Sequence, residues 1–491
     1  MEKLYVACEF GPRTSRVVLG TLHNNALKIG ELRRFATPVL TEKKAFQWNI
    51  PELFQETVKA LAGLGAKEVN VAGISCSSWG GDYLLFDADG TLLSPAFHHD
   101  DPRSGEGAKA VLKKISAETI YGETGVANRP GSTLFQLGAE TSKRLKHATK
   151  LLPFADGFNH LLGGVAVAEA SLASTTQLYS PATKSWSRRL TDDLRLRPGL
   201  LPEIVSAGTK LGPLRADLAK QTGLVDAQII ASCSNELAAS LSGLPLNHGR
   251  DWAYMHIGSE TLIGTEVSDP IINDATQTLG YTNETCLGGA TNLYRRTVGL
   301  FILDECHRFW IERDRELGDD VLMHLATTST PFEVFIDPTD ARFSEPGDMP
   351  EKIQAFCRET GQEIPRKTGQ IIRCVLESLA LHYRKMIQEA ELLTGRRFGR
   401  VFLFGSGENS LLNHFIVDAL QVPAIIASPD AAAIGNVVVQ ALALGHIRSL
   451  EAAHEILCRS NKIQAINPHE ACWHTAAERM AELSANAPTL A

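Results

Sequence analysis

The stretch "CEFGPRTSRVVLG", residues 8–20, decides the fold prediction, because a similar stretch, "MHIGSETLIGTEV", occurs at residues 255–267. Each places a glycine turn and a hydroxyl residue between two β-rich segments, a pattern typical of a tight hairpin. A single turn of this kind is common and indicates only a structural hairpin. Two of them, one near the start of each half of the chain, predict two similar sheets whose turns hold one phosphate chain from both sides.

The hydrophobic pattern between these hairpins alternates between strands and helices. It predicts two domains, residues 1–244 and 245–458, each a mixed sheet flanked by helices, and a C-terminal helix and tail at 459–491. We expect the tail to pack back on the first domain. The expected strands are 3–10, 16–22, 26–37, 69–76, 400–405 and 424–428, and the expected helices are 51–64, 105–115, 133–145, 188–196, 294–313, 352–359, 367–394 and 430–445.

Composition restricts the class of function. The net charge of −8 disfavours a nucleic-acid binder, which usually presents a basic face, but it permits local anion sites made of backbone N–H groups. No segment has the roughly 18 apolar residues of a membrane span, and "MEKLYVACEF" does not match a signal peptide. The nine scattered cysteines form no C-x-x-C pair, which indicates a reducing compartment. We therefore expect a cytoplasmic protein without nucleic-acid or membrane partners.

A third glycine-rich turn, "FGSGENSLLN" at residues 404–413, joins an expected strand to an expected helix. Backbone amides at a helix start suit an anion, and glycine permits its close approach. The spacing matches neither G-x-x-x-x-G-K-[ST] nor G-x-G-x-x-G, so it predicts neither a P-loop nor a dinucleotide site. A structural turn and a ligand site therefore remain equal alternatives here.

An isolated acid, Glu236, follows the apolar run in "IIASCSNELAASLSG", residues 229–243, and begins an Ala-rich helical segment. A carboxylate at that place is stabilised by the helix dipole, and the same carboxylate is able to accept a proton from a substrate. The two interpretations are compatible with each other.

His98 to Asp101 form a run of residue types that bind metals, and we expect them to lie on a strand. Neighbouring residues on a strand point to opposite faces, so these side chains make a poor set of ligands. We expect no metal ion there.

The motifs together resemble the FGGY-type sugar kinases, and among them the rhamnulose kinases. The resemblance covers residues 3 to about 440 and implies the two-domain actin-like ATPase (ribonuclease H-like) fold, an α/β fold with a cleft between the domains. It implies sugar and ATP as substrates, Mg²⁺ as a cofactor and a monomer or homodimer. The matching stretches are "EFGPRTSRV", "GISCSSWGGDYLLFD", "HHDDPRS", "TLFQL", "ASTTQLYS", "CSNELAAS", "GSETLIG", "FGSGENSLLN" and "AAAIGNVVVQALALG".

The resemblance also implies residue roles. Glu236 takes the position of the family's catalytic Asp, and Glu9 takes that of an acid that helps to hold Mg²⁺. The implied sugar-binding residues, several of them in the W-G-x-D-like turn "SSWGGD", are Trp79, Gly80, Gly81, Asp82, Asp101 and Asn235. The implied ATP-binding residues are Gly11, Thr14, Ser15, Arg16, Gly258, Ser259, Thr261, Gly405, Ser406, Gly407 and Asn409.

The implied reaction transfers the γ-phosphoryl group of ATP to a hydroxyl of a ketose such as L-rhamnulose, with Glu236 as general base. Glu9 and Glu236 both stand where the family usually has Asp. One added methylene moves a carboxylate by about 1.5 Å, and a misplacement of about 1 Å can cost ~100-fold in rate. This departure motivates an alternative, a catalytically weak homologue that binds sugar or nucleotide as a sensor or scaffold. Another actin-like ATPase without a sugar acceptor is disfavoured by "SSWGGD" and "ASTTQLYS".

Overall fold

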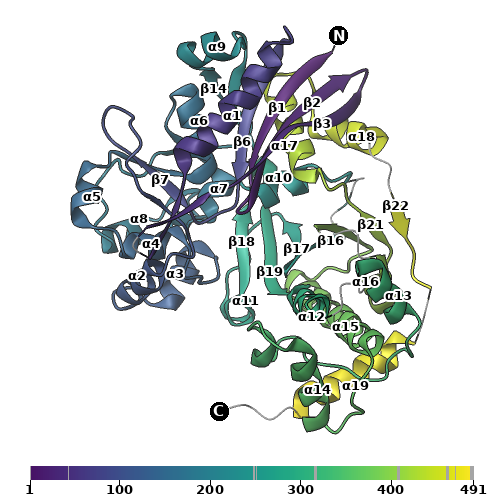
Figure 1. The fold of residues 1–491 in the computed structure, drawn as a ribbon. Helices are drawn as coiled ribbons and strands as arrows, with labels where there is room; N and C mark the ends of the chain where they lie inside the picture. Colours follow the sequence, from purple (N-terminus) through teal and green to yellow (C-terminus); the bar gives the residue numbers. More distant parts are fainter. Residues whose placement is uncertain are drawn as a thin grey trace. The chain divides into compact units, whose positions relative to one another are not determined.

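The computed structural model describes residues 2–42, 44–246, 249, 251–313, 318–405, 410–460, 464–469 and 472–486. Its contacts divide the chain into two compact units, each discontinuous in sequence (Figure 1). The sequence predicts contiguous domains instead, and the boundaries after residues 244 and 458 stay a prediction. Unit 1 comprises Met1–His248, Glu266–Leu293 and Asp430–Lys462, and unit 2 comprises Gly249–Thr265, Tyr294–Pro429 and Ile463–Ala491.

The central sheet of unit 1 has the strand order β14-β15-β6-β1-β2-β3. β1 and β2 form the antiparallel hairpin expected around residues 8–20, and their register places Glu9 opposite Arg16. β15, β6 and β1 run parallel, so their carboxyl ends meet at one edge, where sheets of this kind bind ligands. The strands are β1 (Lys3–Phe10), β2 (Thr14–His23), β3 (Ala26–Ala36), β6 (Val71–Ser78), β14 (Thr209–Pro213) and β15 (Gln228–Ala231).

Side chains of this sheet alternate between two buried faces, as the strand period of two requires. On β1, Val6 and Cys8 belong to the core on one face and Tyr5 and Ala7 to the core on the other, and all four are fully buried. Helices cover both faces (Figure 1). The first face packs against α1 (Ile50–Gly65) and α6 (Phe154–Gly163), and the second packs against α17 (Ala431–Ala443) and α18 (Leu450–Ser460).

The remaining elements of unit 1 are short. The helix expected over 133–145 is two helices, because Thr141 caps a new helix by accepting a hydrogen bond from the Arg144 N–H. The short strands are β4 (Val39–Glu42), β5 (Ala45–Trp48), β7 (Tyr83–Phe86), β8 (Ala96–Phe97), β9 (Lys150–Pro153), β10 (Val167–Glu169), β11 (Tyr179–Ser180), β12 (Ser185–Trp186), β13 (Glu203–Val205) and β18 (Tyr281–Thr285). The helices are α2 (Arg103–Leu112), α3 (Ala117–Thr124), α4 (Thr133–Gly138), α5 (Ser142–His147), α7 (Ala170–Ser174), α8 (Arg188–Asp193), α9 (Ala216–Thr222), α10 (Glu236–Ser242) and α11 (Asp274–Leu279).

Unit 2 is built on strands in the order β19-β17-β16-β20-β21-β22. β16 and β17 form the second expected hairpin, and β16 runs parallel to β20. The strands are β16 (Trp252–Ile257), β17 (Glu260–Val267), β19 (Thr291–Val298), β20 (Arg400–Gly405), β21 (Ala424–Ile426) and β22 (Gln464–Ile466). The helices are α12 (Phe301–Ile311), α13 (Asp319–Thr327), α14 (Met349–Glu359), α15 (Thr368–Thr394), α16 (Ser410–Leu420) and α19 (Trp473–Asn486).

Two expectations for the second half of the chain are wrong. Residues 294–298 belong to β19 and not to a helix, because their backbone pairs within the sheet and the helix begins only at Phe301. The C-terminal helix α19 packs on α15 and α16 within unit 2 and not on the first domain. Trp473 anchors it, with its ring 5.3 Å from Phe415 and 4.9 Å from Phe332.

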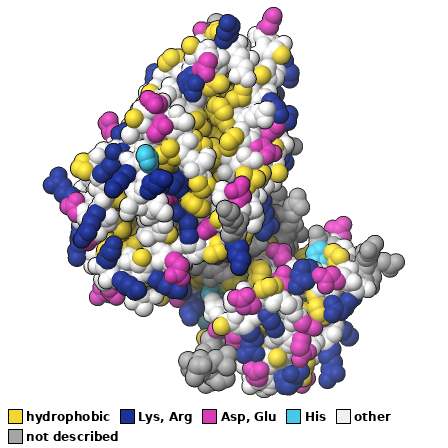
Figure 2. Space-filling view, turned by 60° about the vertical axis from the view of Figure 1, so that its left-hand side comes forward, with side chains coloured by type: hydrophobic (Ala, Val, Ile, Leu, Met, Phe, Trp, Pro, Cys, Tyr) yellow, Lys and Arg dark blue, Asp and Glu magenta, His cyan; other side chains and the backbone are white. Residues whose placement is uncertain are grey.

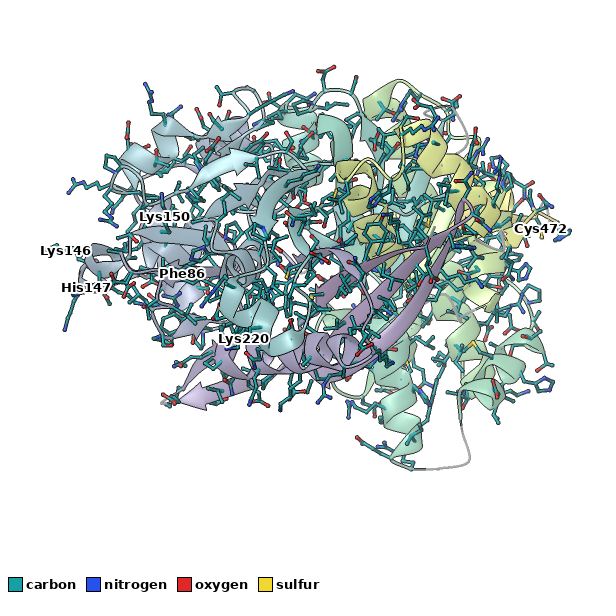
Figure 3. The ribbon with its side chains drawn as sticks, turned by 90° about the horizontal axis from the view of Figure 1, so that it is seen from above. Phe86, Lys146, His147, Lys150, Lys220 and Cys472 are labelled. Carbon is teal, nitrogen blue, oxygen red and sulfur yellow. The ribbon has the colours of Figure 1, made fainter. Side chains whose placement is uncertain are left out.

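Charged side chains are mixed over the surface. Lys146 and His147 of α5 lie beside Lys150 of β9 at one margin of unit 1 (Figure 3), and both α5 residues are exposed. Figure 2 shows cationic and anionic side chains interspersed on the face it presents, with the cationic ones gathered toward one flank. Among the described residues, no helix is long and apolar enough to cross a bilayer.

The two helices α10 and α17 pack within unit 1 with their backbones in contact. A Cβ added to Gly435 would lie 1.9 Å from the Ala239 carbonyl oxygen, and one added to Gly243 would lie 2.1 Å from that of Ala431. Only glycine permits this approach, because no other residue lacks a Cβ. The close packing fixes α10, whose first residue is Glu236.

Alanine substitution at Gly435 tests this packing. We expect Gly435→Ala to destabilise the protein by about 1–3 kcal/mol, because the clash with the α10 backbone exceeds the gain in helix propensity. Gly63→Ala is the matched control, since Gly63 is an exposed helical glycine with open space around its Cβ position. The control should gain about 0.5–1 kcal/mol. Urea midpoints measure both effects, and equal stability of the two variants would contradict the packing argument.

Candidate functional site

The carboxyl-terminal edge of the unit 1 sheet brings three distant segments together. In the register, Glu9 lies beside Ser77. Ser78 and Asn235 form a parallel bridge, in which the Ser78 N–H donates to the Ser234 carbonyl. Each chain then continues by one residue, to Trp79 and to Glu236. The candidate base is therefore a neighbour of the W-G-G-D turn, although the two lie more than 150 positions apart in sequence.

Glu236 is the first residue of α10, and the preceding residue caps that helix. The Asn235 side-chain oxygen accepts a hydrogen bond of 3.0 Å from the Ala238 N–H. Burial raises the pKa of Glu236, and the nearby Arg16 guanidinium partly opposes that rise. The position of Glu236 thus agrees with a helix-start acid, and its pKa shift favours a proton acceptor.

The first hairpin carries an ionic cluster of Glu9, Arg16 and Asp430. Arg16 Nε lies 2.6 Å from Glu9 Oε2, and its Nη1 lies 2.6 Å from Asp430 Oδ1. The pKa of Glu9 is raised to about 7, chiefly by burial and in part by the charges of Glu236 and Asp430, while Arg16 opposes the rise. Glu9 and Glu236 are therefore close enough to interact electrostatically.

The charge balance of this cluster fits a divalent cation. The carboxyl groups of Glu9, Glu236 and Asp430 interact with the guanidinium of Arg16, and that of Glu31 lies 4.0 Å from it. Mg²⁺ prefers oxygen ligands, keeps several waters and needs only one or two carboxylates when phosphates complete its shell. Glu9 is suited to hold such an ion, directly or through a water molecule.

The predicted phosphate turn divides into an open side and a side bonded within the protein. Thr14 is exposed and Gly11 is half-buried. Ser15 is fully buried, and its hydroxyl lies 2.7 Å from the hydroxyl of Thr37, which donates to the Gly11 carbonyl at 2.6 Å. Ser15 and Arg16 therefore brace the turn, and Thr37, which the sequence did not suggest, holds it closed.

Asp82 is the centre of a buried hydrogen-bond network. Its side chain is fully buried. Its Oδ2 accepts from Trp48 Nε1 at 2.9 Å, Trp79 Nε1 at 2.7 Å and His99 Nδ1 at 2.8 Å. Its Oδ1 accepts from Gln136 Nε2 at 2.9 Å. Four donors of this kind satisfy an ionised carboxylate, so Asp82 orients the side chains around it.

Those side chains form an aromatic wall. The ring of Trp48 lies 4.7 Å from Trp79 and stacks on His98 at 4.2 Å, and Trp79 lies 4.5 Å from Phe154. Burial lowers the pKa of His99, but its hydrogen bond and charge interaction with Asp82 outweigh that effect, and the net shift is upward. Trp48 and His99 were not among the predicted sugar-binding residues. Only the unusual density of aromatic residues in "FQW" and "FHH" signalled them.

The strand geometry expected at His98–Asp101 is wrong. Residues 98–100 belong to no strand, His99 and Asp100 lie in a turn, and the rings of His98 and His99 are 4.2 Å apart. The ligand atoms of His98, His99 and Asp100 lie within 4.8 Å of one another. The fourth residue, Asp101, is buried and accepts hydrogen bonds from the backbone N–H groups of Phe46 and Arg103.

The glycines of the W-G-G-D turn are required by their surroundings. A Cβ on Gly80 would lie 2.4 Å from Thr175 Oγ1, and Gly81 has a φ of 96°. The turn therefore tolerates no other residue at the first position without movement, and the second position favours glycine.

In unit 2, the second hairpin is also tied to its surroundings. The Ser259 hydroxyl donates to Asp304 at 3.3 Å, and the buried Thr261 hydroxyl lies 2.9 Å from that of Tyr383. The Gly258 carbonyl accepts from the Leu300 N–H at 2.7 Å. The charge of Glu260, unfavourable beside a phosphate, is paired with Arg296 at 2.6 Å.

The third glycine turn is described only at its start. Gly405 ends β20 with a φ of 102°, and a Cβ there would lie 2.3 Å from the Ile257 carbonyl. Ser406, Gly407 and Asn409 lie outside the described residues.

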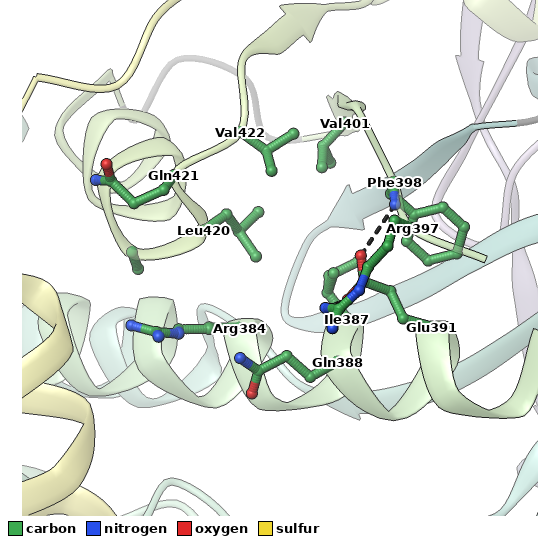
Figure 4. A pocket seen from close by; sticks show the side chains of 11 residues that line it. Arg384, Ile387, Gln388, Glu391, Arg397, Phe398, Val401, Leu420, Gln421 and Val422 are labelled. Atoms are coloured by element: carbon green, nitrogen blue, oxygen red, sulfur yellow. Dashed lines mark hydrogen bonds and ion pairs between the residues drawn. The ribbon is translucent and has the colours of Figure 1, made fainter. Parts of the chain in front are cut away.

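A cavity of about 280 Å³ in unit 2 lies apart from this turn (Figure 4). Val401, at the start of β20, lines it, whereas Gly405 ends the same strand. At about 3.3 Å per residue the two positions are roughly 13 Å apart. Glu391 there is bonded to Arg397 and to the Phe398 N–H. None of the residues that line the cavity is among the predicted ATP-binding residues.

Known proteins resemble this chain over nearly its whole length. The FGGY family of carbohydrate kinases matches through its N-terminal domain at residues 4–243 and its C-terminal domain at residues 253–444. A rhamnulokinase of Bacteroides thetaiotaomicron is 30% identical over 486 residues, covering 97% of this chain and 98% of that protein. A rhamnulokinase of Enterococcus faecalis is 31% identical and covers 95% of each chain.

Solved structures share the fold. A xylulose kinase of Lactobacillus acidophilus superposes with a TM-score of 0.82 at 16% identity, covering 99% of both chains. A Plasmodium falciparum glycerol kinase determined with ADP has a TM-score of 0.80 at 12% identity, covering 99% of this chain and 97% of that chain. Such low identities show the fold alone, and they confirm the expected two-domain α/β architecture. The two matched domains, together with the full-length relatives, show that the chain belongs to the FGGY family of carbohydrate kinases.

Proposed function

We propose that this chain transfers the γ-phosphoryl group of ATP to a hydroxyl of a ketose such as L-rhamnulose, with Glu236 as the general base. The observation that carries the proposal is the placement of Glu236 beside the W-G-G-D turn, through the bridge of Ser78 and Asn235, and within electrostatic reach of Glu9. The full-length resemblance to proteins named rhamnulokinase supports the choice of acceptor. A cytoplasmic location follows from the same proposal.

The proposed role of Glu236 is to take the proton of the acceptor hydroxyl as the new bond to phosphorus forms. An alcohol is a weak nucleophile, and a carboxylate within hydrogen-bond reach improves it. The raised pKa of Glu236 suits this role, because a stronger base accepts the proton more readily.

ATP and Mg²⁺ are proposed substrate and cofactor. Mg²⁺, when bound, neutralises charge on the transferring phosphoryl group. In unit 1 we assign its contact to Glu9 and the phosphate contacts to the turn of Gly11 and Thr14. In unit 2 we assign nucleotide contacts to Gly258, Ser259 and Gly405. Arg16, bonded to both Glu9 and Asp430, has the role of keeping those acids in place.

The proposed sugar site is the aromatic wall held by Asp82. The face of Trp79 offers an apolar surface to the C–H groups of a sugar, and His99 offers a polar ring edge to a hydroxyl. Asp82 acts by orienting both side chains, since its oxygens already accept four hydrogen bonds.

A catalytically weak homologue that only binds sugar or nucleotide is the second candidate. The observation that favours it is the ion pair between Arg16 and Glu9, because an acid committed to a guanidinium is less available to a metal ion. The two candidates differ in turnover and not in binding.

The decisive measurement is sugar-dependent ADP release with ATP and Mg²⁺ across a panel of ketoses and alditols. Turnover is expected with at least one ketose. Sugar binding by calorimetry without any turnover would establish the weak homologue instead.

Replacement of Glu236 tests its role as base. Glu236→Gln keeps the volume but cannot accept the proton, so kcat should fall by about 10²–10⁴-fold while sugar affinity stays nearly the same. Glu236→Asp is the geometric control, since it retains the carboxylate and shifts it by about 1.5 Å. The kcat of Glu236→Asp should lie between that of the wild type and that of Glu236→Gln. An unchanged kcat in Glu236→Gln removes this residue from the role of base.

The pH dependence of kcat provides an independent test. A base must be deprotonated, so activity should be full above its pKa and fall as the pH decreases through it. Burial raises the pKa of Glu236, and the apparent pKa of the acidic limb should therefore exceed the ordinary Glu value of about 4.3. Stopped assays in a constant-ionic-strength buffer series measure it. A flat profile from about pH 8 to about pH 4.5 contradicts the assignment.

Substitution of His99 tests the sugar site. His99→Gln should raise the KM for the sugar by about 10-fold and leave the KM for ATP unchanged, because one hydrogen bond to the sugar is lost. His147→Gln, on the exposed end of α5 (Figure 3), is the control and should change neither constant. Equal effects on both substrates would argue that His99 acts on the fold and not on the sugar.

A further inference from the structure

Two buried acids lie directly behind the segment that carries Glu236. Asp156 on α6 is 2% exposed, and Glu169 at the end of β10 is 1% exposed. Neither forms a salt bridge with another residue that the structure describes. Burying acids without a cation is costly, so hydrogen bonds must compensate, and the donors of these bonds identify what the acids hold.

Two of those donors belong to Ser234, which lies two residues before Glu236, and the others come from Glu169 and Ser171. The Ser234 N–H donates to Glu169 Oε2 at 2.9 Å, and the Ser234 hydroxyl donates to Asp156 Oδ1 at 2.7 Å. Ser234 is fully buried and joins the two acids. A third link, from the Glu169 N–H to Asp156 Oδ2 at 2.9 Å, connects the acids to each other.

A relay extends this network to Asn235. The Ser171 hydroxyl donates to Glu169 Oε2, and the Ser171 N–H donates to Glu169 Oε1 at 3.0 Å. The Ser171 oxygen in turn accepts from the Asn235 N–H at 3.1 Å. A backbone N–H can only donate, so the Asn235 N–H uses a lone pair of the Ser171 oxygen and the Ser171 hydrogen is directed to Glu169.

We propose that Glu169 is a positioning residue for the proposed base, acting through Ser171 and Ser234 to fix the backbone from which Glu236 projects. The inference rests on the proposed function and deepens it. The same segment is held on its other side by the bridge to Ser78. The Ser234 and Asn235 N–H groups donate to Glu169 and Ser171 on one side, and the Ser234 carbonyl accepts from Ser78 on the other. These bonds fix the backbone at the start of α10.

These hydrogen bonds hold the backbone before Glu236 from within unit 1, and they do not involve the side chain of Glu236. Glu169 thereby acts on the rate without contacting the substrate.

A double-mutant cycle tests the proposal. Glu169→Gln places an NH₂ donor against groups that are themselves donors, so the loop should shift and kcat should fall ~10–100-fold in the wild-type background. In the Glu236→Gln background the same substitution should change the residual kcat by less than about 3-fold. The base is already absent from that variant, so a shift of its backbone has no further effect on the rate. Ser171→Ala, which breaks only the relay to Asn235, should lower kcat less than Glu169→Gln does.

The matched control is Glu377→Gln in α15. Glu377 is equally buried and bonded to Arg373, so its loss should lower the thermal midpoint without altering kcat. An equal fall of kcat for Glu169→Gln in both backgrounds, or a fall that Glu377→Gln reproduces at a similar thermal midpoint, would overturn the positioning role.

A second readout separates this inference from the proposed function. Hydrogen exchange reports the Ser234 and Asn235 amides directly, and in Glu169→Gln they should exchange faster while amides of Leu84–Phe86 stay unchanged. If the wild type shows no turnover, the proposed function is wrong. If hydrogen exchange at residues 234–235 is then also unchanged in Glu169→Gln, the inference is wrong as well. Faster exchange there shows that Glu169 holds the backbone before Glu236.

Discussion

The parallel alignment of β15, β6 and β1 is the constraint on which the site depends. Parallel strands end at the same edge, so residues that follow them are brought together whatever their distance in sequence. The bridge of Ser78 with Asn235 continues the alignment beyond the last regular pairs. It places the W-G-G-D turn, the acid Glu9 and the start of α10 at one edge of unit 1.

Charge compensation explains much of the polar structure around that edge. A pair of acids and a single acid lie there, and their charges are compensated by different donors. Glu9 and Asp430 share the guanidinium of Arg16, and Asp82 is satisfied by the N–H donors of rings and an amide. Behind them Glu169 relies on hydroxyl and backbone donors, and burial still raises its pKa to about 7 against those donors. The donors differ, but in each case the bonds hold a side chain or a loop in place at the carboxyl-terminal edge of the unit 1 sheet.

Helix packing supplies the rigidity behind this arrangement. α17 is encoded almost 200 residues after α10, yet both belong to unit 1, and their backbones touch at Gly435 and Gly243. The segment that contributes Asp430 to the ion cluster also contributes this helix. One late segment of the chain therefore completes both the core and the charge balance of the earlier part.

The sequence by itself determined the two hairpins, the family and the approximate position of the acid at 236, because these depend on short motifs and on their order along the chain. It also singled out Asp82, which the structure places at the centre of a buried hydrogen-bond network. It did not reveal that Trp48 and His99 share the Asp82 carboxylate, that Ser15 is turned inward to Thr37, or that Glu169 supports the loop before Glu236. It misplaced the start of α12 and the contact of the tail. These features depend on contacts between residues far apart in the chain. Only the tertiary structure decides them, because a buried carboxylate is satisfied by whichever donors the fold brings to it, and no local pattern records which donors those are.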